Sequence, residues 1–190
     1  MTKGELPLMK GWRDPMRKTN RALLIIDMLR DFIEAEGALS LGESGRQIIP
    51  AVRERLDRAR ARGDLVIFVR DSHRPDDPEF DMFPPHCVAG TPGAEIIPEL
   101  APSDEDVMIF KRRYSAFFAT ELDLVLREHG VDALDLCGVC TNICVLYTAA
   151  SARNLAYAVT VHRDAVAAPV REAGEWALSE MEQTLGCTVV

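Results

Sequence analysis

The sequence predicts an α/β fold with a mostly parallel sheet, and two features carry this prediction. Short apolar runs of strand length alternate with segments of helical periodicity after residue 20. The runs are continuously apolar, which is typical of parallel strands buried on both faces. Over residues 21–190 we therefore expect a single-domain, Rossmann-like three-layer sandwich, with about six strands and helices on both faces. Residues 1–20 mix Gly, Pro and charges without a period, and we expect an irregular N-terminal arm there.

The first predicted strand is the run ALLIIDM at residues 22–28. Residues 44–62 place their apolar side chains on one helical face, and Gly63 ends this helix. After a second strand at 64–70, residues 71–100 are rich in Pro, Asp and Gly, and so long a loop in a compact domain is usually functional. The remaining predicted elements are a strand at 106–110, a helix at 119–129, a strand at 133–137, a helix that contains Cys144, a strand at 157–161, a helix at about 170–185 and a strand at 187–190.

Composition excludes several classes of function. A net charge of −8 opposes a nucleic-acid surface, which needs a basic patch. No apolar run is long enough to span a bilayer, and the first residues lack the apolar core of a signal peptide. Five cysteines cannot all pair within one chain. We therefore expect a cytoplasmic protein that acts on a small molecule, without nucleic-acid or membrane partners.

Cys144 is the first candidate for catalysis. Residues 134–155 read as a buried strand, a tight turn and a helix, with Cys144 just inside the helix and Thr141 and Asn142 suited to its cap. Unpaired N–H groups and the positive end of the helix dipole favour a thiolate there, and the same N–H groups can stabilise an oxyanion. The alternative is an ordinary buried cysteine.

Polar residues follow the carboxyl ends of three predicted strands: Asp27, Lys111 and Cys144. In a parallel sheet these ends meet at one edge. A carboxylate beside a thiol can take its proton, and an ammonium group favours the thiolate. Asp27 is therefore the candidate general base for Cys144, with Lys111 balancing the charges.

These residues lie in the motifs LLIIDMLRDF, KRRYSAF and GVCTNICV, which resemble those of the isochorismatase-like cysteine hydrolases, and among them the nicotinamidases, over about residues 20–190. The resemblance implies a catalytic triad of Asp27, Lys111 and Cys144 that hydrolyses nicotinamide to nicotinate and ammonia through a thioester. It also implies a cis peptide bond between Val139 and Cys140, with the backbone N–H groups of Cys140 and Cys144 directed at the oxyanion.

The resemblance further implies one divalent transition metal, held by Asp71, His73 and His86, which match through RDSH and FPPHCVAGTPGAE. Two imidazoles and a carboxylate with open positions suit zinc, iron or manganese. Glu79 lies in the same loop, either as a fourth ligand or, as we favour, as a solvated carboxylate. His129 and His162 have no matching role, and we expect them at a helix end and a strand end.

Phe32 and Phe83 are expected either to flank the substrate ring or to belong to the core. Family members often have Trp where Phe83 stands and Gln where Leu29 stands. A related hydrolase of carbamoyl or ureido amides therefore remains an alternative. Another is a non-catalytic zinc or thiol-redox protein that uses the C-x-x-C pair Cys137 and Cys140, although a structural zinc site would need a second pair. The resemblance also implies a homo-oligomer.

Overall fold

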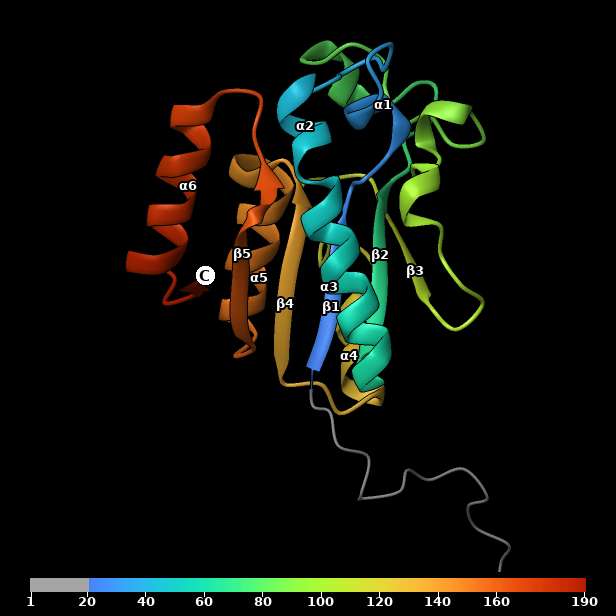
Figure 1. Ribbon diagram of the computed structural model, residues 1–190. Coiled ribbons are helices and arrows are strands. Elements are labelled where there is room, and N and C mark those ends of the chain that lie inside the picture. Colours follow the sequence, from blue (N-terminus) through green and yellow to red (C-terminus); the bar gives the residue numbers. More distant parts are fainter. Residues whose placement is uncertain (1–20) are drawn as a thin grey trace, which may run out of the picture.

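The computed structural model describes residues 21–190, and the predicted N-terminal arm lies outside the described residues. Six parallel strands form one sheet in the order β3-β2-β1-β4-β5-β6 (Figure 1). The strands are β1 (Arg21–Ile26), β2 (Leu65–Asp71), β3 (Val107–Lys111), β4 (Ala133–Val139), β5 (Ala158–Ala167) and β6 (Thr188–Val189). This order is that of the Rossmann sheet, so the predicted fold class is confirmed.

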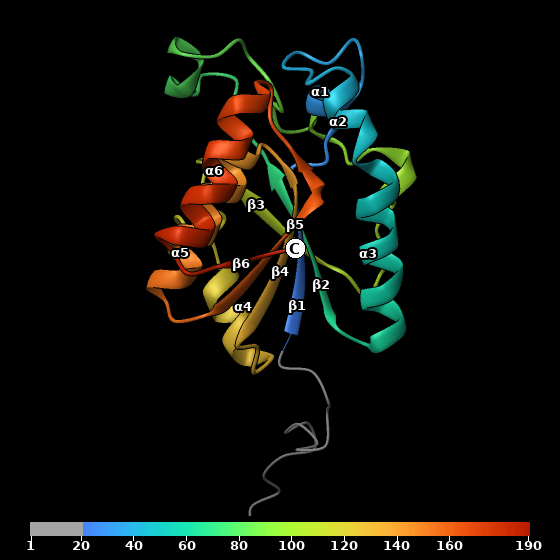
Figure 2. The ribbon, with the colours of Figure 1, turned by 60° about the vertical axis from the view of Figure 1, so that its left-hand side comes forward.

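Helices cover both faces of the sheet. They are α1 (Arg30–Ile33), α2 (Glu43–Gln47), α3 (Ile49–Arg62), α4 (Leu122–Glu128), α5 (Leu146–Asn154) and α6 (Arg171–Gln183). Figure 2 shows α3 on one side of the sheet and α4, α5 and α6 on the other, which makes three layers. In the described part of the chain, no helix is long and apolar enough to cross a membrane.

The buried side chains of β1 explain why its sequence is continuously apolar. Leu24 and Ile26 pack on the face covered by α4, α5 and α6, whereas Leu23 and Ile25 pack on the face covered by α3. All four side chains are buried. Burying one such side chain contributes about 1.5–3 kcal/mol, and a strand with a helical layer on each face gains this from every position.

Several predicted element boundaries were wrong. The single helix expected at 44–62 is two helices, α2 and α3, and β4 ends at Val139 rather than at residue 137. β5 continues to Ala167, so His162 lies within the strand rather than at its end, and its Nε2 is 3.4 Å from the Asp135 carboxylate. Helix α4 begins at Leu122 rather than at Ala119, because Ala119 has a φ of 54°, which is incompatible with a right-handed helix. The short helix α1 was not predicted.

The carboxyl ends of the parallel strands define the edge where a site can form. β1 and β4 are neighbours in the sheet, but the chain leaves β1 towards β2 and leaves β4 towards β5. The order of the strands therefore reverses between them, which opens a crevice at this edge. The segment after β1, with α1, and the long loop after β2 both lie at this end of the sheet, at the top of Figure 1.

Candidate active site

Lys111 lies between two carboxylates at the ends of neighbouring strands. Its Nζ is 2.7 Å from Oδ2 of Asp27 and 2.6 Å from Oδ1 of Asp71. All three residues are buried. Oδ1 of Asp27 also accepts a hydrogen bond of 2.9 Å from the Asp71 backbone N–H. The pairing of β3 with β2, in which Lys111 is opposite Asp71, brings these groups together.

Cys144 completes this cluster from the far side of the crevice. Its Sγ is 3.4 Å from Nζ of Lys111, and it lies with carboxylate oxygens of Asp27 and Asp71 in a group of atoms all within 4.8 Å of one another. The structure thus brings the three residues Asp27, Lys111 and Cys144 together, as the sequence predicted.

A π-helical turn, Thr141–Val145, carries Cys144 and runs directly into α5. It is closed by a hydrogen bond of 3.1 Å from the Val145 N–H to the Cys140 carbonyl. The predicted capping by Thr141 and Asn142 is wrong: the N-cap position belongs to Cys140, and no side chain caps the turn. Since β4 continues through Val139, the turn begins directly at the end of the strand, without a separate capping loop. The expected cis peptide bond between Val139 and Cys140 is present.

The buried cluster has strongly shifted pKa values. Burial, and then the charge of Asp71, raise the pKa of Asp27 to about 6, although Lys111 opposes this. Burial lowers the pKa of Lys111, but the two carboxylates outweigh it and raise that pKa well above its usual value. Burial also raises the pKa of the Cys144 thiol, and Lys111 only partly offsets the effect. Before substrate binds, Cys144 is therefore a neutral thiol beside the Asp27 carboxylate rather than a thiolate.

Three metal donors converge beside the cluster. Oδ2 of Asp71 lies 3.6 Å from Nε2 of His73 and 3.9 Å from Nε2 of His86. Nδ1 of His86 is 2.8 Å from the Pro84 carbonyl oxygen, which can only accept, so Nδ1 carries the proton and the Nε2 lone pair is free. Nδ1 of His73 is 3.2 Å from the Asp77 carboxylate, with the same consequence for His73.

This donor set fits a divalent transition metal. Nε2 of His73 is buried and has no hydrogen-bond partner among the described residues, which is costly for a polar atom unless it binds something. One carboxylate oxygen and two imidazole nitrogens, all within 4.8 Å of one another, are a ligand set used by zinc, iron and manganese. The three predicted metal ligands are therefore brought together.

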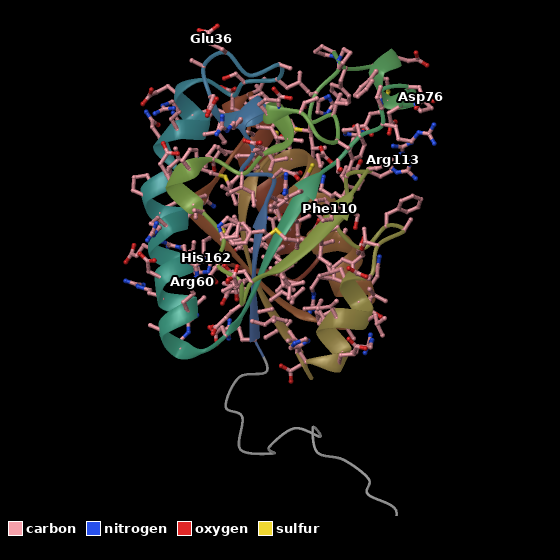
Figure 3. All side chains as sticks on the ribbon, turned by 90° about the vertical axis from the view of Figure 1, so that its right-hand side faces the viewer. Glu36, Arg60, Asp76, Phe110, Arg113 and His162 are labelled. Carbon is pink, nitrogen blue, oxygen red and sulfur yellow. The ribbon has the colours of Figure 1, made fainter. Side chains whose placement is uncertain are left out.

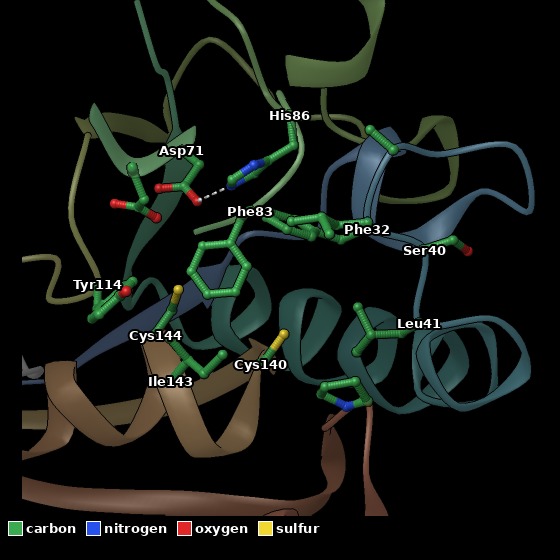
Figure 4. Close-up of a pocket in the computed structure, with 14 residues that line it drawn as sticks. Phe32, Ser40, Leu41, Asp71, Phe83, His86, Tyr114, Cys140, Ile143 and Cys144 are labelled. Carbon is green, nitrogen blue, oxygen red and sulfur yellow. Dashed lines mark ion pairs between the residues drawn. The ribbon is translucent and has the colours of Figure 1, made fainter. Parts of the chain in front are cut away.

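A pocket of about 320 Å³ is lined by Cys144 and Asp71 of the cluster and by His86 of the donor group (Figure 4). The sulfur atoms of Cys140 and Cys144 point into it, and Asp71 and His86 lie across from them. The predicted aromatic residues Phe32 and Phe83 both line this pocket. Its other walls were not predicted, and they include Leu39, Leu41, Tyr114, Ile143 and Pro169.

Comparison with known proteins identifies the family to which this chain belongs. A family model described as the isochorismatase domain matches residues 21–190. The chain belongs to the isochorismatase family.

Solved structures of isochorismatase-family proteins match over nearly the whole chain. A nicotinamidase/pyrazinamidase from Bacillus subtilis is 40% identical with a TM-score of 0.86, covering 90% of this chain and 98% of that one. A pyrazinamidase from Pyrococcus horikoshii, in complex with zinc, is 36% identical with a TM-score of 0.84, covering 90% and 98%. An N-carbamoylsarcosine amidase from Thermoplasma acidophilum is 36% identical with a TM-score of 0.82, covering 89% and 94%.

Other predictions for this isochorismatase-family chain had mixed outcomes. Glu79 is not a solvated loop carboxylate: it is buried and lines the pocket, because the turn Pro78–Asp81 folds it inward. His129 stands at the helix end, as expected. Cys137 is fully buried with its Sγ 3.6 Å from the Leu24 carbonyl oxygen. Among residues 21–190, the candidate groups of metal donors include neither Cys137 nor Cys140.

Proposed function

We propose that this chain is a cysteine-dependent amidohydrolase that converts nicotinamide to nicotinate and ammonia. The observation that carries the proposal is the contact of Lys111 Nζ with Asp27, Asp71 and Cys144 at 2.7, 2.6 and 3.4 Å, on a pocket of about 320 Å³. Similarity to a nicotinamidase/pyrazinamidase and to a zinc-bound pyrazinamidase supports the same activity.

In the first half-reaction, Sγ of Cys144 attacks the carbonyl carbon of the amide, and the Asp27 carboxylate accepts the thiol proton. A pKa of about 6 leaves Asp27 ionised at neutral pH and close enough in pKa to pass the proton on. The backbone N–H groups of Cys140 and Cys144 stabilise the oxyanion. Asp27 then protonates the leaving nitrogen, the C–N bond breaks, and ammonia departs from a thioester on Cys144.

In the second half-reaction, Asp27 takes a proton from water, and the resulting hydroxide attacks the thioester carbonyl. The C–S bond breaks, and the Cys144 sulfur recovers the proton from Asp27. The acid product leaves as nicotinate, its carboxyl proton passing to solvent. Lys111 keeps its charge throughout, because the two carboxylates hold its pKa well above its usual value despite burial. Its ammonium group offsets the negative charge that develops beside Asp27 and Asp71.

Asp71, His73 and His86 would hold a divalent transition metal at the pocket wall. Its chemistry would be to coordinate the pyridine nitrogen and so orient the ring, while Phe32 and Phe83 would contact the ring faces.

We also propose that the chain forms a homo-oligomer, which sedimentation velocity tests.

A second candidate is a carbamoyl or ureido amidohydrolase, because the chain is also 36% identical to an N-carbamoylsarcosine amidase. Such substrates lack a pyridine nitrogen. Ammonia release from nicotinamide and from a panel of carbamoyl amides, each with and without a chelator, separates the two candidates. If a carbamoyl amide is turned over faster than nicotinamide, and the chelator does not change that rate, the carbamoyl or ureido amidohydrolase is favoured.

Cys144→Ala tests the mechanism directly. We expect ammonia release to fall to background, because no thioester can form. Cys187→Ala is the matched control, since Cys187 is buried but does not line the pocket. Normal ammonia release by Cys144→Ala would overturn the proposed mechanism.

A further inference from the structure

Asp77 is a buried carboxylate directly behind the metal donors, four residues after His73. Its side chain is 2% exposed, and its Oδ2 lies 3.2 Å from Nδ1 of His73. Its Oδ1 accepts a hydrogen bond of 3.0 Å from the Glu79 backbone N–H. Asp77 is not part of the donor group formed by Asp71, His73 and His86. With His73 and Glu79 it forms a second candidate group, in which its Oδ2 faces Nδ1 of His73 rather than Nε2.

Arg113 holds Asp77 from outside. Its Nη1 lies 3.1 and 3.2 Å from the two oxygens of Asp77. Figure 3 shows the side chains of Arg113 and Asp76 at the outer edge of the molecule. The Glu79 N–H and the Arg113 guanidinium both donate to this carboxylate, so Asp77 is placed as a hydrogen-bond acceptor for His73.

We propose that Asp77 is a positioning residue that holds His73 in the tautomer with its proton on Nδ1 and its Nε2 lone pair directed at the metal position. A carboxylate that accepts the second ring proton of a metal-binding histidine fixes both ring orientation and tautomer. This inference rests on the metal site of the proposed function and assigns a role to a residue outside the ligand set.

The two histidines of this site are anchored differently. Nδ1 of His86 donates to the Pro84 carbonyl oxygen, a backbone atom that no side-chain substitution removes. Nδ1 of His73 depends on the Asp77 side chain. A side-chain substitution can therefore change the hydrogen-bond partner of His73 Nδ1 without altering any of the three proposed metal ligands.

Asp77→Asn is the informative substitution because it keeps the shape of the side chain. The Glu79 N–H can only donate, so the Asn oxygen stays with it and the Asn NH₂ group faces Nδ1 of His73. A donor at this position requires Nδ1 to accept, which moves the ring proton to Nε2. In that tautomer, Nε2 of His73 carries the proton and offers no lone pair to a metal, so binding must first reverse the tautomer.

The first measurement is the dissociation constant for Zn²⁺, by competition with a chromophoric chelator. We expect Asp77→Asn to weaken zinc binding by roughly 10- to 100-fold. Asp76→Asn is the matched control, because the Asp76 side chain is 69% exposed and pairs with Arg74, and it should keep the wild-type constant. A wild-type constant for Asp77→Asn would overturn the inference.

The second measurement is the ¹⁵N NMR spectrum of His73 in the metal-free proteins at alkaline pH, which reports the tautomer. We expect the proton on Nδ1 in the wild type and on Nε2 in Asp77→Asn. A merely structural role would lower the thermal stability without moving the proton, and that result would also overturn the inference. If the wild type binds no zinc, the metal site of the proposed function fails and the inference with it; if only the Asp77→Asn results fail, the proposed function stands.

Discussion

Replacing Lys111 with Met should destabilise the protein strongly, and the structure allows the size of the effect to be worked out. Met fills a similar volume but leaves Asp27 and Asp71 buried without the ammonium group that lies 2.7 and 2.6 Å from them. With an effective dielectric constant of 20, each contact represents about 6 kcal/mol of Coulomb attraction. The Lys111→Met variant can avoid burying two unpaired charges if Asp27 or Asp71 takes up a proton.

Protonation sets the ceiling on the destabilisation. At pH 7, protonating an Asp with an ordinary pKa of about 3.9 costs about 4 kcal/mol, which is less than the lost attraction. We therefore expect Lys111→Met to lose roughly 3–5 kcal/mol of unfolding free energy, the range measured when one partner of a buried ion pair is removed. Because that variant folds with an added proton, its folded-state carboxyl pKa is raised. Its deficit relative to the wild type should therefore shrink as the pH falls, by up to about 1.4 kcal/mol per pH unit for each additional proton bound.

Urea unfolding at pH 7 and pH 5 measures both effects. Arg53→Met is the control, because Arg53 and Asp57 form an exposed pair whose loss should cost less than about 1 kcal/mol at either pH. The double variant Lys111→Met/Asp27→Asn should be more stable at pH 7 than Lys111→Met alone, since it carries one buried charge fewer. A deficit below about 1 kcal/mol, or one that does not change with pH, would refute this reasoning.

Three further substitutions test the fold. Gly138→Ala would place a Cβ in steric overlap with the Ile26 carbonyl oxygen at a φ of +109°, so we expect a loss of at least about 3 kcal/mol of unfolding free energy in urea. Gly90→Ala, at a φ of +81° but in open space, should lose only about 1 kcal/mol, and equal losses would show that the contact with Ile26 is unimportant. Asp135→Asn should reduce stability at pH 7 and have progressively less effect as the pH falls below about 4. Burial raises the pKa of Asp135, but hydrogen bonds and charge from His162 and Arg21 lower it below its usual value, so its contribution is present above the unfolded pKa and lost in acid. An effect that stays constant across this range would contradict the assignment.

The sheet could be predicted from sequence because parallel strands with a helical layer on each face must be apolar at every position. The catalytic candidates followed from the same logic, since Asp27 and Lys111 are polar residues placed where apolar strands end. Cys144 was found for a different reason: its helix-start context and motif mark it, even though the turn itself has a π-helical form.

What sequence could not supply was the folding of the long loop after β2. Glu79 resembles any acidic loop residue, and only the turn that begins at Pro78 buries it. Asp77 cannot be recognised from the sequence either. Its carboxylate is held by a hydrogen bond from Arg113, a residue 36 positions away that only the tertiary fold brings close. The capping prediction for Thr141 failed because a local rule was applied where the tertiary path of β4 decides the start of the turn.

Asp71 gives its two oxygens to two different neighbourhoods: Oδ1 contacts the lysine, and Oδ2 faces the two imidazoles. An engineer who replaced this residue to alter metal preference would at the same moment strip the ammonium of a counter-ion. The proposed metal site and the proposed catalytic cluster therefore share one carboxylate, and a substitution of Asp71 made to alter either one also alters the other.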